Sequence, residues 1–360
     1  MPRQNLKVVD KLTITFLVDN SIEWMTKLPP GFSLEILLHL RQGIPPDETT
    51  GVPVLDFDKF CCGAHGFSAL LETQVNDESP HLTLFDTGPD SLSLVRNIKA
   101  LQIPVYEIDR VVFSHWHSDH TGGLLSFLRL RDSPCIVDVH PDRPILRGIA
   151  PGPTFRDVIC AIPPDPTFAQ IVEAGGVVEM HPEAHSVAGN TVWVSGEIAR
   201  VTKYETGMAS AVRWTERTAA DKNVAEGKWV PEPHIMDERY AAVDVAGKGL
   251  VLFSACSHAG IVNVVKDAIA TFNRPVYMIV GGLHLAGTEF EPRLAPTINF
   301  LSEQLRPAPT YVLPMHCSGF RTKVALENAL GEGCVPAGVG HRVDIIGNKD
   351  DESLLHPPVY

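Results

Sequence analysis

The sequence predicts a four-layer α/β/β/α architecture, in which two β-sheets pack face to face and helices cover their outer faces. Three observations lead to this fold class. Short apolar runs typical of strands recur through the first third of the 360-residue chain, strands and helices alternate in the last third, and no internal repeat is visible. Two half-domains, each a sheet with outer helices, bury their apolar faces by pairing sheet against sheet.

The first third combines strand-like runs with two predicted helices. Residues 91–101 carry apolar side chains at helical spacing after the turn Gly88-Pro89-Asp90, which predicts a helix with one apolar face. A second helix is expected over residues 121–130, opening at a Gly-Gly pair. The predicted strands are residues 12–18, 67–71, 82–85 and 111–113.

The middle of the chain lacks clear periodicity. Residues 141–166 are crowded with proline and glycine, and residues 202–238 are polar. We interpret them as insertions, near 141–170 and 202–238, in a single domain that spans residues 1–360. The second insertion carries Trp214 and Trp229 without a core-facing period, so it is expected either to cover the substrate or to be a peripheral loop packed on its own aromatic side chains.

Regular alternation returns in the last third, where the predicted order is β-α-β-α-β. The expected strands are residues 250–253, 276–280 and 311–313, and the expected helices are residues 261–272 and 294–305.

Composition excludes several classes of function. Hydrophobic residues make up 44% and charged residues 20%, as in soluble globular proteins, and a net charge of -13 without a basic stripe argues against a nucleic-acid partner. Seven cysteines at irregular spacings indicate a reducing compartment rather than a disulfide framework. No secretion signal is visible, and the apolar runs are far shorter than the roughly 20 residues that span a bilayer. We therefore expect a cytoplasmic protein that acts on a small molecule without a membrane partner.

The strongest chemical signal is the run Ser114-His115-Trp116-His117-Ser118-Asp119-His120, which follows a predicted core strand. Side chains two residues apart in an extended segment point the same way, so His115 and His117 can bind one metal ion. Asp119 and His120 lie past the bend and can face a second ion. A chain with 15 histidines can cluster some of them by accident. Four polar side chains at the end of a core strand would then each need water or a hydrogen-bond partner, because burying a polar group without one costs free energy. These ligands suit zinc first, and also manganese or ferrous iron.

This His-x-His-x-Asp-His pattern resembles the metallo-β-lactamase superfamily, and that resemblance implies the αββα fold. Further motifs, spread from about residue 12 to 320, resemble its archaeal dihydropterin-ribofuranosyl-aminobenzene-phosphate synthase-like branch. They are Asp19-Asn20, Gly66-Phe67-Ser68, Leu84-Phe85-Asp86-Thr87-Gly88, Ser195-Gly196-Glu197-Ile198, Cys256-Ser257-His258-Ala259-Gly260-Ile261-Val262-Asn263, Gly281-Gly282-Leu283-His284-Leu285 and Pro314-Met315-His316-Cys317-Ser318-Gly319.

The resemblance also implies further metal ligands. Cys256 stands at a strand end where relatives often carry a bridging aspartate, and His316 stands at the last ligand position. A buried cysteine is also a common core residue, so packing is the alternative for Cys256. The third ligand of the first ion stays open between His185, its competitor His181, and neither, because the usual His-Thr-Pro-Gly turn is absent.

Two histidines and one aspartate are expected to assist at the same rim. His258 and His284 each follow a predicted strand of the second half and are assigned catalytic roles, with an ordinary loop histidine as the alternative. Asp86 is expected to orient a ligand histidine by a hydrogen bond rather than to bind metal.

The expected activity is hydrolysis by a metal-bound hydroxide, with Asp119 orienting the attack and receiving the proton. No Gly-x-Ser-x-Gly elbow, P-loop or dinucleotide fingerprint offers a rival site. Few cations lie near the motifs and none forms a phosphate cradle, which favours a small cyclic amide or ester as substrate. The alternatives are a pterin-related synthase-like or phosphoester-cleaving enzyme, and an iron-dependent oxygenase on the same fold.

Overall fold

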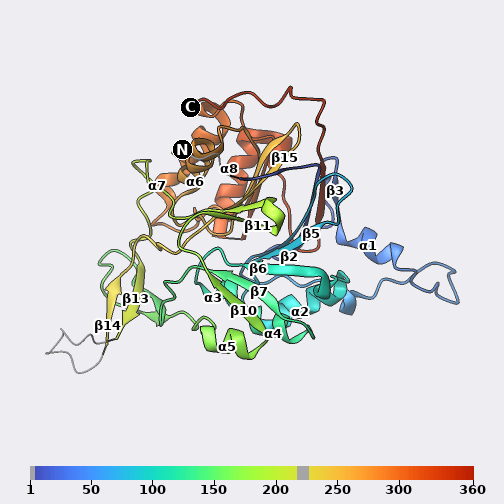
Figure 1. Ribbon diagram of the computed structural model, residues 1–360, viewed down its shortest axis with the longest axis horizontal. Helices are drawn as coiled ribbons and strands as arrows, with labels where there is room; N and C mark the ends of the chain where they lie inside the picture. The colour runs from blue at the N-terminus through green and yellow to red at the C-terminus, as the bar shows by residue number, and fades with distance from the viewer. Residues whose placement is uncertain (1–4, 217–226) are drawn as a thin grey trace.

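Two large β-sheets face each other in the computed structural model, which describes residues 5–216 and 227–360. Helices cover the outer face of each sheet, so that α6 and α8 lie on one side of the molecule and α2, α4 and α5 on the other (Figure 1). The predicted four-layer fold class is confirmed.

The first sheet contains eight strands within the described residues, in the order β10-β7-β6-β5-β4-β2-β19-β3. Strands β5, β6, β7 and β10 run parallel to one another, and β2 pairs antiparallel with both β4 and β19. The strand bounds are β2 Lys11–Val18, β3 Phe32–Ser33, β4 Ser68–Gln74, β5 His81–Phe85, β6 Ile108–Val112, β7 Cys135–Val139, β10 Gly176–Met180 and β19 Arg342–Ile346.

The second sheet has the order β11-β12-β15-β16-β17-β18, with β1 beside β15. Strands β16, β17 and β18 are parallel, so their carboxyl ends meet at one edge of the sheet. The bounds are β1 Val8–Val9, β11 His185–Val187, β12 Val192–Val194, β15 Ala241–Val245, β16 Gly249–Ser254, β17 Val276–Gly282 and β18 Tyr311–Met315.

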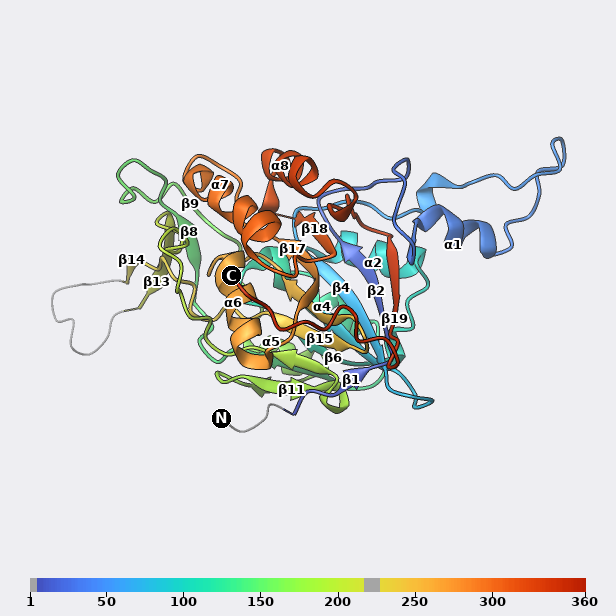
Figure 2. The ribbon, with the colours of Figure 1, turned by 90° about the horizontal axis from the view of Figure 1, so that it is seen from above.

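A third, smaller sheet joins the two segments that were interpreted as insertions. Strands β8 Arg147–Ile149 and β9 Cys160–Ala161 come from the first segment, and β13 Ala211–Thr215 and β14 Lys228–Pro231 come from the second. β13 pairs antiparallel with β8 across more than sixty residues of chain, a contact that local periodicity does not reveal. Residues 217–226 of the predicted insertion 202–238 lie outside the described residues. Figure 2 shows this sheet at the opposite end of the molecule from α1.

Two of the four predicted helices are present as expected, two differ, and α1, α5 and α8 were not predicted. Helix α2 begins where Asp90 accepts hydrogen bonds from the backbone N–H groups of Leu92 and Ser93, and α6 spans the predicted residues 261–272. The single helix expected over 121–130 is instead two short helices, and the helix expected over 294–305 starts earlier and ends as a π-helix. The bounds are α1 Glu35–Arg41, α2 Ser91–Ala100, α3 Ser118–Thr121, α4 Leu124–Arg129, α5 Phe168–Glu173, α6 Ile261–Phe272, α7 Glu291–Asn299, the π-helix η4 Phe300–Gln304 and α8 Phe320–Leu330. Short 3₁₀ turns are η1 Phe57–Lys59, η2 Val105–Glu107, η3 Ala188–Asn190, η5 His316–Ser318 and η6 Gly331–Gly333.

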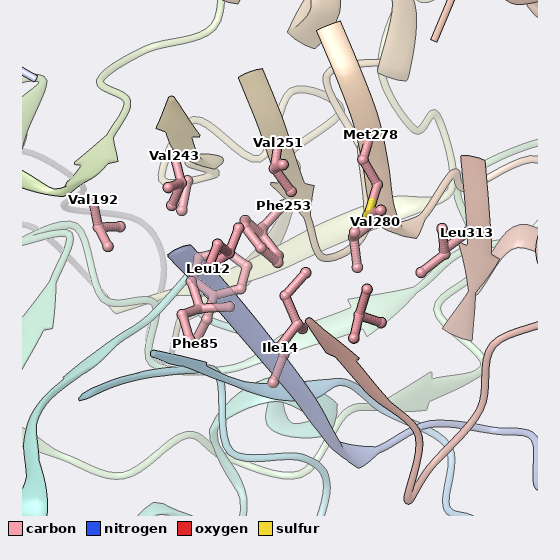
Figure 3. Close-up of a cluster of buried hydrophobic side chains, with 14 of the residues drawn as sticks. Leu12, Ile14, Phe85, Val192, Val243, Val251, Phe253, Met278, Val280 and Leu313 are labelled. Carbon is pink, nitrogen blue, oxygen red and sulfur yellow. The ribbon is translucent and has the colours of Figure 1, made fainter. Parts of the chain in front are cut away.

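The apolar core lies in three layers that match this architecture. The central layer fills the space between the two large sheets, where Ile14 and Phe85 of the first sheet meet Phe253 and Val280 of the second (Figure 3). A second layer packs helices α2 and α4 on the first sheet, and a third packs α6, η4 and α8 on the second. The two sheets are therefore held at a fixed separation, which in turn fixes the loops at their edges.

Among the described residues, no helix combines the length and apolar character needed to cross a bilayer.

Candidate metal centre

The histidine run lies at the carboxyl end of β6 and turns directly into α3. Asp86, at the end of the neighbouring strand β5, accepts hydrogen bonds from the Ser114 backbone N–H at 2.7 Å and the Ser114 hydroxyl at 2.6 Å. The oxygen that accepts the hydroxyl, Oδ2, also lies 2.7 Å from His120 Nδ1, which directs His120 Nε2 toward the centre of the site. Asp86 is fully buried and has a φ of 59°, so the strand end is held in a conformation that most residues avoid.

A first group of donors consists of three buried histidines, His115, His117 and His258, whose nitrogen atoms lie within 4.8 Å of one another. His115 Nε2 and His117 Nδ1 are 2.9 Å apart. Glu238 Oε1 lies 2.9 Å from His258 Nδ1, and the Glu238 carboxylate also accepts the backbone N–H groups of His258 and Ala259. His258 Nε2 is thereby free to face the other two imidazoles.

A second group joins Asp119, His120, Cys256 and His316, whose donor atoms also lie within 4.8 Å of one another. His120 Nε2 is 3.2 Å from Cys256 Sγ, and His316 Nε2 is 3.4 Å from Asp119 Oδ2. Asn20 Oδ1 lies 3.0 Å from His316 Nδ1, so the other nitrogen of that ring points at the carboxylate. Each group thus offers at least three ligand atoms at one place.

Three strand ends of the second sheet present their donors from strained backbone. Ser257 after β16, His284 after β17 and His316 after β18 have φ angles of 63°, 45° and 41°. Non-glycine residues adopt this left-handed region rarely and at a cost of about 1–3 kcal/mol, most often at functional sites. The strain therefore marks this edge of the sheet as a site rather than a plain set of turns.

The electrostatics of both groups suit a cation. Burial, together with the neighbouring imidazoles, lowers the pKa of both His115 and His117, so both rings are neutral, which is the form that binds metals. Burial opposes a proton on His120, but Asp119 and Asp86 raise the pKa of His120 to about 9. Burial also opposes ionisation of Asp119, yet His120 and His316 hold its pKa well below the usual range. The carboxylates thus attract a positive charge that a metal ion can supply.

The residues fit the metal that the fold implies. In the part of the chain that the structure describes, His117 Nε2, His316 Nε2 and His284 Nδ1 are buried without any hydrogen-bond partner, an arrangement that is costly unless another ligand satisfies them. Imidazole, carboxylate and thiolate donors together are typical of zinc and neighbouring transition metals.

A pocket of about 190 Å³ opens onto both groups. His65, His117, Asp119 and His316 contribute to its floor, and the third sheet and the loop before it form the opposite wall. The wall residues are Arg147, Gly148, Ile149, Ile162, Met208, Ser210, Ala211 and Val212. Residues of the third sheet and of the loop before it therefore line the pocket together with the donor residues.

One predicted ligand does not reach the centre. His185 Nε2 lies 2.7 Å from Asp138 Oδ2, and its ring stacks on His181 at a centroid distance of 4.0 Å, in a separate cluster of these three residues. Strand β11, which starts at His185, sits at the far edge of the second sheet and cannot bring this side chain to His115. His258 occupies the place beside His115 and His117 instead.

The remaining predicted residues gather in one place. Cys256 and His316 lie with Asp119 and His120, whereas His284 lies with Cys256 and Cys317. Sequence reasoning missed Glu238, Arg147 and the role of His65 as a lining residue. Glu238 gave a usable signal, since it belongs to the charged run Asp237-Glu238-Arg239 directly before a buried strand.

Comparisons with known proteins agree with this geometry. Residues 78–202 match the family model of the metallo-beta-lactamase superfamily. The chain is 28% identical over 263 residues to the 7,8-dihydropterin-6-methyl-4-(beta-D-ribofuranosyl)-aminobenzene-5'-phosphate synthase of Methanocaldococcus jannaschii, covering 72% of this chain and 82% of that protein. An uncharacterised protein of the same organism is 25% identical over 268 residues, covering 73% and 87%.

A solved structure described as a metal-dependent hydrolase of the beta-lactamase superfamily superposes with a TM-score of 0.64 at 19% identity, covering 93% of this chain and 99% of that one. This last likeness concerns the fold. The resemblance predicted from the motifs is confirmed.

Proposed function

We propose that this chain is a metal-dependent hydrolase of the metallo-beta-lactamase superfamily that cleaves a small, weakly charged cyclic ester or amide. The observation that carries the proposal is the composition of the pocket. Ligand atoms suited to a metal line its floor, whereas its wall is largely apolar and offers no free cation among the described residues.

The one arginine in the pocket is already engaged. Arg147 forms ion pairs with Glu232 at 2.7 Å and with Asp237 at 2.5 Å, and its side chain is 3% exposed. A phosphate group would need an arginine or lysine fork that is free to turn toward it. The volume of about 190 Å³ is also below the roughly 300–1,000 Å³ of pockets for drug-sized ligands, which favours a small substrate.

Zinc is the proposed metal, with His115, His117 and His258 as one ligand set and Asp119, His120, Cys256 and His316 as the other. An ion bound there would supply Lewis acidity and would lower the pKa of a water molecule toward neutrality.

Asp119 is the proposed proton acceptor. Its side chain is 24% exposed, so one oxygen faces the pocket while the other elements of the site stay buried. His65 Nε2 lies 3.7 Å from Asp119 Oδ2 and its side chain is 69% exposed, which gives the proton a route from the carboxylate to solvent. The apolar side chains Ile149, Met208 and Val212 exclude bulk water from the opposite side of the substrate.

The test is a substrate panel assayed with chelator-treated protein that has been reloaded with zinc, manganese or ferrous iron. We expect turnover of lactones or lactams, with little or no cleavage of phosphodiesters or thioesters. Turnover of phosphodiesters alone, with all carbonyl substrates inert, would contradict the proposal.

A second candidate follows from the 28% identity to a protein named as a pterin-linked phosphate synthase. If the chain has this synthase-like function, its substrate carries a phosphate. Turnover of a ribofuranosyl-aminobenzene phosphate in the same panel would favour this second candidate. The two candidates are separated by which substrate in the panel is turned over, because the cyclic ester or amide hydrolase predicts no turnover of that phosphate.

A further inference from the structure

A third group of donors lies beside the metal centre and joins Cys256, which the second ligand set also contains, to two residues that belong to neither set. Cys256, His284 and Cys317 stand directly beyond the carboxyl ends of the neighbouring parallel strands β16, β17 and β18. Their sulfur and nitrogen atoms lie within 4.8 Å of one another. Cys317 also lines the pocket, so this group is open to small ions.

The spacing of the two sulfur atoms matches a shared metal ligand set. Cys317 Sγ lies 3.6 Å from Cys256 Sγ. With zinc–sulfur bonds of about 2.3 Å, two thiolates at neighbouring corners of a tetrahedron are about 3.8 Å apart. A disulfide would require about 2.05 Å, so the two thiols are free, and their hydrogen-bond separation is close to that of two ligands of one ion.

Two further observations indicate that this place is built to hold a ligand. A Cβ atom on Gly282 would lie 2.5 Å from Cys317 Sγ and 2.4 Å from the Ala255 carbonyl oxygen, so only glycine leaves room for the thiol. His284 Nδ1 is buried and, within the described residues, has no hydrogen-bond partner, although the backbone of His284 is strained with a φ of 45°. Unsatisfied buried nitrogen and strained backbone together are typical of ligand positions.

We propose that Cys256, Cys317 and His284 form an additional metal position that binds a thiophilic divalent ion next to the ion held by Asp119, His120 and His316. Cys256 belongs to both groups, and its thiolate lies between the two positions. Two sulfurs and one imidazole select zinc or cadmium over manganese and magnesium, because hard ions prefer oxygen ligands. The inference concerns metal binding and does not depend on the substrate proposed above.

The test uses cadmium ions and the full chain after removal of metals with a chelator. Thiolates bound to Cd²⁺ give a charge-transfer absorption in the near ultraviolet that imidazole and carboxylate ligands do not give. We expect this band in the wild type, about half its intensity in Cys317→Ser and in Cys256→Ser, and none in the double variant. Cys160→Ser is the matched control, since Cys160 is exposed and is neither a lining residue of the pocket nor a member of any donor group, and it should keep the full band.

A full-intensity band in Cys317→Ser, or Cd²⁺ binding by the wild type without any band, would overturn the proposal. A measurement on the unaltered chain guards against a variant that fails to fold. Cd²⁺ should protect Cys317 from alkylation by iodoacetamide, as scored by peptide mass spectrometry, while Cys160 stays reactive. Equal alkylation of Cys317 with and without Cd²⁺ would also overturn it. A thiolate band in a chain that hydrolyses no substrate would instead count against the proposed function alone.

Discussion

Asp86 shows how one buried carboxylate can organise a site without binding the metal. Its carboxylate oxygens accept hydrogen bonds from the backbone N–H and the hydroxyl of Ser114 and from Nδ1 of His120, all within 2.7 Å. The hydrogen bond between Asp86 and a histidine of the motif, which was expected from the sequence, is present, with the carboxylate of Asp86 as the acceptor. The residue therefore fixes both the end of β6 and the orientation of His120, and it acts as a positioning residue.

Replacing Asp86 with asparagine should weaken metal binding. The side-chain amide N–H₂ would face a nitrogen of His120 that must itself donate a proton, so the ring would lose its orientation. We expect zinc affinity to fall by about 10–100-fold, as measured by competition with a coloured chelator. Asp109→Asn, a half-exposed site remote from the pocket, is the control. Unchanged affinity in Asp86→Asn would show that the hydrogen bond has no such role.

Asp119→Ala should abolish turnover and leave the fold intact, because Asp119 lies at the pocket rather than in the apolar core. We expect a loss of at least about 10²–10⁴-fold, the range for a proton-transfer group, in kcat on whichever substrate the panel identifies. His117→Ala should lower both turnover and metal content. Far-ultraviolet circular dichroism checks folding, and near-normal rates in both variants would place the active site elsewhere.

Asp165 predicts a pH dependence of stability outside the ligand sets. Burial raises the pKa of Asp165 from 3.8 to about 6, although the hydrogen bond that the Thr121 hydroxyl donates to its carboxylate acts to lower this pKa. The folded state thus holds this proton more tightly than the unfolded state, so the free energy of unfolding falls as pH rises from about 4 to about 6. Asp165→Asn cannot ionise and should be up to about 3 kcal/mol more stable than wild type at pH 7.5, with no advantage at pH 4. Melting temperatures across this range test the expectation, and a constant difference at all pH values would refute it.

At the scale of elements, the short helices α3 and α4 carry the site because two glycines allow them to pack closely against the loop after β5. A Cβ atom on Gly122 would lie 2.0 Å from the Pro89 carbonyl oxygen, and one on Gly123 would lie 2.2 Å from the Thr87 carbonyl oxygen. The backbone at both points has no room for a side chain. Asp119 and His120 belong to α3, so their positions depend on the close packing of these glycines against the loop after β5.

Gly123→Ala should therefore destabilise the protein and disturb metal binding together. The clash is with backbone, which cannot move as a flexible side chain would, so we expect a loss of more than about 3 kcal/mol in the free energy of unfolding. Gly43→Ala is the comparison, because a Cβ atom there meets nothing within 4 Å and only its φ of 70° is unfavourable. Similar melting temperatures for the two variants would contradict the packing argument.

Much of the candidate site could be predicted from the sequence because the patterns that indicate it lie within short segments of the chain. The four motif donors are close in sequence, and helix α6 is defined by its own apolar periodicity and the glycine before it. The position of His258 beside His115 was not predictable, because it depends on two sheets being packed face to face. The choice between His185, His181 and neither was left open by the sequence for the same reason, since only the packed sheets show that His185 lies on an edge strand.

At the scale of the whole molecule, the third sheet determines what the pocket can admit. Met208 and Val212 come from the segment that contains β13, whereas Ile149 comes from β8, and all three line the pocket. Variation in these segments can change the substrate while the two large sheets keep the metal centre fixed.

Met208→Ala should enlarge the pocket and shift specificity toward bulkier substrates. Each added methylene that the larger pocket accommodates is worth about 1–3 kcal/mol, so we expect the ratio of kcat/KM for a longer to a shorter acyl chain to rise by at least about 10-fold. Val201→Ala, an exposed site in the neighbouring segment, is the control. An unchanged ratio would mean that this wall does not contact the substrate.

The placement of β19 has a consequence for how the chain folds. This strand comes from residues 342–346, yet it pairs with β2 near the beginning, and Thr13 bonds to Asp344 across 331 positions. Until β19 has been synthesised, β2 is an open edge of the first sheet, able to pair with another nascent chain. Such distant pairing makes folding slow, since the long loop must close before the contact forms. The first sheet, which begins with β2, is thus completed only after β19, a strand near the end of the chain, has been synthesised. Aggregation competes with folding between the synthesis of these two strands.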